Sequence, residues 1–222
     1  MLTSPAGVLF DMDGTLIDSE GLWLAAEISV MGELRARWTA DDQAICLGGP
    51  LERVVDYMIT RSGTDRPSSD IKRMLLDMME RQLRATPLAW RPGARSLLAE
   101  ARNRGIPSAL VSASWTRLID AVSEKLDEDL GGRAFDVVVA GDDVTHSKPH
   151  PEPYETAARL LGFATADCLA LEDSPTGVVS ALTAGCRVVA IPHLAVIDAE
   201  GVLITDSLEG WTLDALWAAA HR

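Results

Sequence analysis

Short apolar runs alternate with helical patterns along most of the chain. The first run, "GVLF" (7–10), is continuous rather than alternating and is bounded by glycine and aspartate, which is typical of a buried strand. Five further runs have the same character: "IPSALVS" (106–112), "FDVVVA" (135–140), "CLALE" (168–172), "CRVVAI" (186–191) and, less strongly, "GVLIT" (201–205). Because continuous apolar strands are buried on both faces, these runs predict a parallel sheet.

Amphipathic segments between the runs predict the helices of the fold. Three of them have a proline early and a glycine late: "RPGARSLLAEARNRG" (91–105), "PEPYETAARLLG" (151–162) and "SPTGVVSALTAG" (174–185). Proline favours the first turn of a helix, and glycine favours the position after its last turn. Strands that alternate with such helices predict an α/β fold, a Rossmann-like parallel sheet covered by helices on both faces.

Residues 18–87 interrupt this alternation. They contain helical patterns at Leu22–Leu34, Leu51–Ile59 and Ile71–Leu83, and no convincing strand. A helical block of this size after the first strand predicts a second, smaller domain. We therefore expect residues 1–17 and 88–222 to form the sheet-containing domain and residues 18–87 to form an inserted helical domain.

Composition and charge narrow the class of protein. The chain has 222 residues, of which 47% are hydrophobic and 24% charged, and a formal net charge of −13. This acidity argues against nucleic acids and anionic membranes as partners. The three cysteines lack disulfide or zinc spacing, and neither a signal peptide nor a bilayer-length apolar stretch is evident. We expect a cytoplasmic monomer that acts on a small molecule.

Polar side chains follow four of the predicted strands. They are Asp11 and Asp13, Ser112 and Ser114, Lys148, and Glu172 with Asp173. Taken singly, each has a structural explanation: a turn at Asp13-Gly14, a serine helix cap, an exposed loop lysine, or acids at a helix N-terminus. Ligands of parallel sheets bind beyond the carboxyl ends of the strands. The occurrence of polar residues at four strand ends therefore favours a functional site.

Four short segments carry a family resemblance. "FDMDGT" (10–15), "LVSAS" (110–114), "SKP" (147–149) and "LEDSPTG" (171–177) resemble, in this order, the motifs of the haloacid dehalogenase-like superfamily. The chain is most similar to the branch of sugar-phosphate phosphatases and β-phosphoglucomutase-like enzymes. The resemblance spans the whole chain, because residues 18–87 fall where that branch inserts a helical cap.

The resemblance implies a role for each residue of these motifs. Asp11 would be the nucleophile that forms an aspartyl-phosphate, and Asp13 the general acid and then the general base. Ser112 and Lys148 would hold the phosphate. The implied cofactor is Mg²⁺, whose preference for hard oxygen ligands fits the implied set: Asp11, the main-chain carbonyl of Asp13, Asp173, and Glu172 directly or through water.

Further residues are expected around the substrate. Those near the phosphate are Gly14, Thr15, Ala113 and Ser114, and the candidates in the cap for contacts with the leaving group are Glu20, Trp23 and the "LGGPLER" segment (47–53). An aromatic residue of a helix core is an equally good interpretation of Trp23.

These expectations define one function and two alternatives. We expect a Mg²⁺-dependent phosphatase that hydrolyses a small phosphorylated metabolite, with sugar phosphates as the default class of the family. A phosphomutase, or an inactive binding protein with the same fold, remains an alternative. Resembling mutases grip a second phosphate with a cap histidine and arginine. The corresponding positions here hold Trp23 and Leu51, although Arg53 lies two residues further on.

Overall fold

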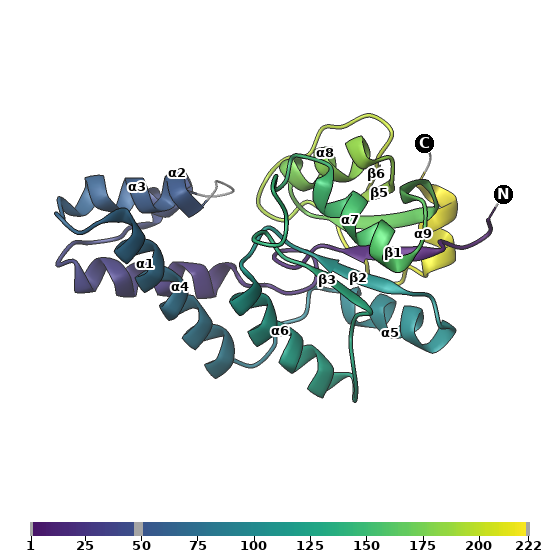
Figure 1. Cartoon of the computed structure of the whole chain (residues 1–222), viewed down its shortest axis with the longest axis horizontal. Helices are drawn as coiled ribbons and strands as arrows, with labels where there is room; N and C mark the ends of the chain where they lie inside the picture. Colours follow the sequence, from purple (N-terminus) through teal and green to yellow (C-terminus); the bar gives the residue numbers. More distant parts are fainter. Residues whose placement is uncertain (1, 47–50, 221–222) are drawn as a thin grey trace. The chain divides into compact units, whose positions relative to one another are not determined.

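The apolar runs form the strands of one sheet, as the sequence predicts. The computed structural model describes residues 2–46 and 51–220, and the sheet is shown in Figure 1. All adjacent strands are parallel, in the order β3-β2-β1-β4-β5-β6. The strands are β1 (Gly7–Phe10), β2 (Ser108–Val111), β3 (Val137–Val139), β4 (Cys168–Glu172), β5 (Arg187–Ala190) and β6 (Leu203–Ile204). The predicted α/β, Rossmann-like fold is confirmed.

Helices connect these strands, and three of them end where the sequence predicts. α5, α7 and α8 each stop at a glycine with left-handed backbone geometry. Ser174 begins α8, because its hydroxyl accepts a hydrogen bond from the N–H of Gly177 at 3.1 Å. The helices of this part of the chain are α5 (Ala94–Arg104), α6 (Thr116–Asp129), α7 (Glu152–Leu161), α8 (Pro175–Ala184) and α9 (Leu213–Ala219), with a 3₁₀ turn η1 (Thr165–Asp167).

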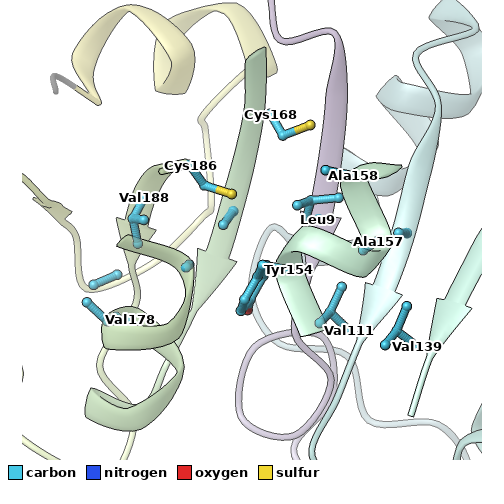
Figure 2. Close-up of a cluster of buried hydrophobic side chains, with 14 of the residues drawn as sticks. Leu9, Val111, Val139, Tyr154, Ala157, Ala158, Cys168, Val178, Cys186 and Val188 are labelled. Atoms are coloured by element: carbon cyan, nitrogen blue, oxygen red, sulfur yellow. The ribbon is translucent and has the colours of Figure 1, made fainter. Parts of the chain in front are cut away.

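The central strands are buried on both faces. Every residue of β1, β2 and β4 is buried. Figure 2 shows one face, where Tyr154 and Ala157 of α7 lie against Leu9 and Val111 of the sheet. On β1 the next residue, Phe10, makes an edge-to-face contact with Phe135, with ring centroids 5.8 Å apart. Burial on both faces explains why these strands are continuously apolar.

The chain divides into two compact units. One consists of Met1–Asp18 and Leu88–Arg222, and the other of Ser19–Pro87. Within the first unit, the segments that lead out of it and back into it are joined, since the N–H of Asp18 donates to the Ala89 carbonyl at 2.8 Å. The chain therefore leaves the first unit and returns to it at neighbouring backbone positions. No helix in the described part of the chain is both long and apolar enough to cross a bilayer.

The described residues of the second unit form helices α1 (Glu20–Glu33), α2 (Ala40–Cys46), α3 (Leu51–Ser62) and α4 (Ser68–Ala85). Three of these match the predicted helical patterns, whereas α2 was not predicted. Its start is fixed by a reciprocal cap: the N–H of Asp42 donates to Thr39 Oγ1 at 3.3 Å, and the N–H of Thr39 donates to Asp42 Oδ2 at 2.8 Å. The sequence carries this signal as a threonine followed three residues later by an acid.

Candidate active site

The register of the sheet brings the predicted residues to one edge. Phe10, the last residue of β1, pairs with Leu110 of β2 and with Leu171 of β4. Asp11 continues this ladder, because its N–H donates to the Leu171 carbonyl at 3.0 Å. Glu172 follows the paired Leu171 directly and Ser112 follows the paired Leu110 by two positions, so both lie at the same edge of the sheet as Asp11.

Lys148 is the centre of the hydrogen-bonding network at this edge. Its Nζ donates to Asp11 Oδ1 at 2.8 Å, to the Val111 carbonyl at 2.9 Å and to Glu172 Oε1 at 2.5 Å. The side chain is only 4% exposed. Burial disfavours the charged amine, but the Asp11 and Glu172 carboxylates outweigh it and raise the pKa of Lys148. Lys148 is thus a buried, charged residue and not an exposed loop lysine.

Three carboxylates lie together at this edge, and two of them, Asp11 and Glu172, contact the ammonium group. One oxygen from each of Asp11, Glu172 and Asp173 lies within 4.8 Å of the others. Burial, followed by the neighbouring carboxylates, raises the pKa of both Asp11 and Asp173. Clustered acids with raised pKa values mark a place where a cation would be stabilised.

The donor atoms at this cluster fit Mg²⁺. Asp11 Oδ2 is buried and has no hydrogen-bond partner among the residues that the structure describes. Both oxygens of Glu172, by contrast, already accept hydrogen bonds, Oε1 from Lys148 and Tyr154, and Oε2 from the hydroxyl of Ser174 at 3.1 Å. Asp11 and Asp173 are therefore the better candidates for direct ligands, and carboxylate oxygens are the donors that Mg²⁺ prefers.

Two glycines allow the carboxylates to approach the backbone. Gly14 has φ of +82°, and a Cβ atom built on it would overlap the carboxylate of Asp173. A Cβ atom on Gly177, in the first turn of α8, would overlap the carboxylate of Glu172 in the same way. Any side chain at either position would displace a member of the acidic cluster.

The loop after β2 is tied to the aspartate pair. The hydroxyl of Ser114 donates to Asp13 Oδ2 at 2.8 Å, and the N–H of Ser114 donates to Ser112 Oγ at 3.0 Å. Ala113 lies between them and is exposed. Thr15 is buried, and its hydroxyl has no partner among the described residues. The structure thus gathers the predicted core residues from all four motifs at one sheet edge.

Sequence reasoning missed two residues that support this network. Tyr154 is fully buried, and its hydroxyl donates to Glu172 Oε1 at 2.6 Å. Lys148 Nζ lies 5.1 Å from the centroid of the Tyr154 ring. Ser174 holds the other oxygen of Glu172. The available signal was the rule that a buried tyrosine needs a hydrogen-bond partner, but the sequence does not say which partner.

The predicted cap residues belong to the helical unit. Glu20 and Trp23 lie on α1, where Glu20 Oε1 accepts from Gln43 Nε2 at 2.8 Å and Trp23 is partly exposed. Residues 47–50 of the "LGGPLER" segment lie outside the described residues, and Leu51 begins α3. Contacts of these residues with a leaving group stay a prediction.

The fold and the site define the class: an α/β protein with a Rossmann-like core and, at its ligand-binding edge, a carboxylate cluster built around a buried lysine. The family follows from comparison with known proteins. The model of haloacid dehalogenase-like hydrolases matches residues 8–191, and the chain belongs to this family. The resemblance carried by the four motifs is confirmed.

The names and titles of the similar proteins refer to phosphatases, to a β-phosphoglucomutase and to a bound sugar bisphosphate. Hexitol phosphatase B of Escherichia coli (strain K12) is 32% identical over 188 residues, which cover 83% of this chain and 82% of the relative. The structure of a CbbY mutant from Rhodobacter sphaeroides, in complex with xylulose 1,5-bisphosphate, is 28% identical, with a TM-score of 0.82 and coverage of 96% and 99%. A putative β-phosphoglucomutase from Thermotoga maritima is 25% identical, with a TM-score of 0.72 and coverage of 97% and 91%.

Proposed function

We propose that this protein is a Mg²⁺-dependent phosphatase that hydrolyses a small phosphorylated metabolite through an aspartyl-phosphate on Asp11. The observation that carries the proposal is the state of the Asp11 carboxylate. Lys148 fixes Oδ1, while Oδ2 is buried at the ligand-binding edge with no partner among the described residues. An oriented carboxylate with one oxygen left for chemistry is what nucleophilic attack on phosphorus requires.

Asp11 and Asp173 would hold the magnesium ion, with the main-chain carbonyl of Asp13 as a further oxygen donor and Glu172 behind them. Bound there, the ion would neutralise negative charge on the transferring phosphoryl group. Support for this assignment comes from the ligand oxygens of Asp11, Glu172 and Asp173, which lie within 4.8 Å of one another, and from the burial and the neighbouring carboxylates that raise the pKa values of Asp11 and Asp173.

In the proposed reaction, Asp11 forms the covalent bond to phosphorus and Asp13 transfers the protons. A carboxylate oxygen of Asp11 forms a bond to phosphorus as the bond from phosphorus to the ester oxygen breaks, and Asp13 gives a proton to the departing alcohol. Water then attacks phosphorus, Asp13 takes a proton from that water, and the bond between phosphorus and Asp11 breaks. Inorganic phosphate and the free carboxylate result. The hydroxyl of Ser114 holds Asp13 in position for both transfers.

The loop after β2 would bind the phosphate, and Lys148 would assist through its positive charge. The ammonium group supplies positive charge that an acidic chain otherwise lacks near its site. Ser112 would add its hydroxyl, and the main-chain N–H group of Ala113 would add a further donor. The unpartnered hydroxyl of Thr15 is a further donor in the loop after β1.

Sugar phosphates are the substrate class that the comparisons support. The named relatives and neighbours include a hexitol phosphatase and a CbbY structure with xylulose 1,5-bisphosphate bound. As part of the proposal, the leaving alcohol is a sugar or polyol, and Glu20 and Trp23 contact it. We place the reaction in the cytoplasm, in keeping with three cysteines that are free and buried. The monomeric state stays a prediction.

A substrate screen tests this proposal. Purified protein with Mg²⁺ is offered a panel of phosphorylated sugars, polyols, glycolate and nucleotides, and the release of inorganic phosphate is measured. We expect hydrolysis of at least one sugar or polyol phosphate, and its loss in excess EDTA. Asp11→Asn should abolish turnover, whereas Asp120→Asn, an exposed aspartate on α6, should not change it. Turnover by Asp11→Asn above a few per cent of the wild-type rate would refute the nucleophile assignment.

A further inference from the structure

A second group of potential metal ligands lies on the segment that carries Lys148. His146 and His150 flank this lysine in the chain, and Glu152 begins α7. One ligand atom from each of His146, His150 and Glu152 lies within 4.8 Å of the other two. Both imidazoles are exposed, and Glu152 is partly buried. Ions in solution can therefore reach the group, which we call the histidine cluster.

The carboxylate of the histidine cluster is already fixed by the backbone. Glu152 Oε1 accepts from the N–H of Thr145 at 2.8 Å, and Oε2 accepts from the N–H of His146 at 3.0 Å. This side chain turns back over the preceding loop and holds it against the start of α7. A ligand that is held before the ion arrives loses less conformational entropy on binding.

The two imidazoles are oriented by the same glutamate. His146 Nδ1 lies 2.9 Å from Glu152 Oε2, and His150 Nδ1 accepts from the N–H of Glu152 at 3.2 Å. The rings stack with centroids 4.5 Å apart and an interplanar angle of 29°. Both Nδ1 atoms therefore face Glu152, so that two nitrogens and one oxygen converge from a segment of seven residues, 146–152.

This donor set favours a different kind of ion than the carboxylate cluster at Asp11 does. Imidazole nitrogen is a poor ligand for Mg²⁺ but a good one for Zn²⁺, Co²⁺, Ni²⁺ and Cu²⁺. Two imidazoles and one carboxylate, with water in the fourth position, form a recurrent zinc ligand set. We propose that His146, His150 and Glu152 form a binding site for a divalent transition metal such as Zn²⁺, separate from the Mg²⁺ site.

Binding requires small changes in the histidine cluster. The ion takes the place of the hydrogen bond between His146 Nδ1 and Glu152 Oε2, and the neutral imidazole then carries its proton on Nε2. At His150 the ion replaces the 3.2 Å hydrogen bond from the backbone. The bound ion then joins residues on both sides of Lys148, and a ligand that binds only the folded protein stabilises it.

Calorimetric titration with Zn²⁺ tests the proposal independently of enzymatic activity. The full-length protein is saturated with Mg²⁺ beforehand, so that the carboxylate cluster is occupied by its own ion. His146→Gln and His150→Gln are compared with His193→Gln, a histidine outside the cluster that lies near Asp18. Glutamine keeps a polar side chain of similar size, and circular dichroism verifies the fold of each variant.

We expect the wild-type protein and His193→Gln to bind one Zn²⁺ ion that each cluster variant binds at least about tenfold more weakly, as the loss of one of three ligands predicts. Zn²⁺ should also raise the melting temperature of the wild-type protein and of His193→Gln more than that of the cluster variants. Equal Zn²⁺ affinity and equal stabilisation in all four proteins would overturn the proposal. Failure of the wild-type protein to bind Zn²⁺ in the presence of Mg²⁺ would overturn it as well.

Discussion

A buried acid in the helical unit makes stability depend on pH in a defined direction. Glu27 on α1 is only 6% exposed, and its Oε2 accepts from the indole N–H of Trp38 at 2.9 Å. Burial raises the pKa of Glu27 to about 7, the Trp38 hydrogen bond opposes this shift, and Glu20 adds to it. The carboxyl group therefore titrates near neutral pH, where an exposed glutamate is fully ionised.

The size of the effect follows from linkage. The pKa rises from 4.5 in the unfolded chain to about 7 in the folded protein, and each unit corresponds to about 1.4 kcal/mol, so ionisation of Glu27 costs about 3 kcal/mol of stability. Because the folded pKa is the higher one, the stability that comes from protonated Glu27 is fully present below the unfolded pKa of 4.5. It is lost as the pH rises through 4.5 and towards 7.

Glu27→Gln isolates this contribution, because glutamine has nearly the same shape and does not ionise. The free energy of unfolding is measured by urea titration from about pH 5 to about pH 8.5 for the wild-type protein, Glu27→Gln and Glu33→Gln. Relative to wild type, Glu27→Gln should gain up to about 3 kcal/mol as the pH rises. Glu33, exposed on the same helix, should show no such trend. A constant difference between Glu27→Gln and wild type across this pH range would refute the reasoning.

Three further predictions concern the site. Lys148→Met should reduce kcat/KM by orders of magnitude and lower stability by about 3–5 kcal/mol, since it leaves Asp11 and Glu172 without their buried cation; an unchanged urea midpoint would contradict this. Tyr154→Phe keeps the packing but removes a hydrogen bond to Glu172, so kcat should fall while KM stays nearly constant, and stability should fall by about 1.5–3 kcal/mol. Kinetics identical to those of the wild-type protein would show that Tyr154 serves only in packing. With β-glucose 1-phosphate and a trace of the 1,6-bisphosphate, inorganic phosphate should be the main product, and faster formation of glucose 6-phosphate would favour the mutase.

The sheet could be predicted from sequence because its strands and the ends of its helices each have a local sequence pattern. Each strand is a short continuous apolar run, and three of the helices between strands end at glycines whose conformation other residues rarely adopt. Parallel pairing then brings the strand ends together, so that Asp11, Ser112 and Glu172 were expected at one edge before any contact was known. The order of the strands, with β1 between β2 and β4, was not predicted, because apolar runs do not encode their neighbours.

The parts that were missed depend on side-chain contacts that apolar periodicity does not reveal. Tyr154 follows Lys148 by six positions, yet its role comes from a hydrogen bond to Glu172, 18 positions further along the chain. The burial of Glu27 likewise depends on Trp38, which a helical pattern alone does not reveal. Helix α2 is short, and its start depends on a pair of side-chain caps at Thr39 and Asp42 rather than on apolar periodicity. In each case the local sequence permits the contact without specifying it.

The balance of charge at the site links recognition of phosphate to the metal. Asp11, Glu172 and Asp173 place three carboxylates against the single ammonium group of Lys148. Such a group of residues repels a phosphate dianion as long as the acids are ionised, and protonation of Asp11 would remove the proposed nucleophile. A divalent cation resolves both difficulties, because it keeps Asp11 ionised and offsets the excess negative charge. We therefore infer that removal of the metal weakens phosphate binding itself, in addition to slowing the chemical step. The neighbouring carboxylates, which add to the effect of burial in raising the pKa values of Asp11 and Asp173, are also the reason for the expected dependence on Mg²⁺.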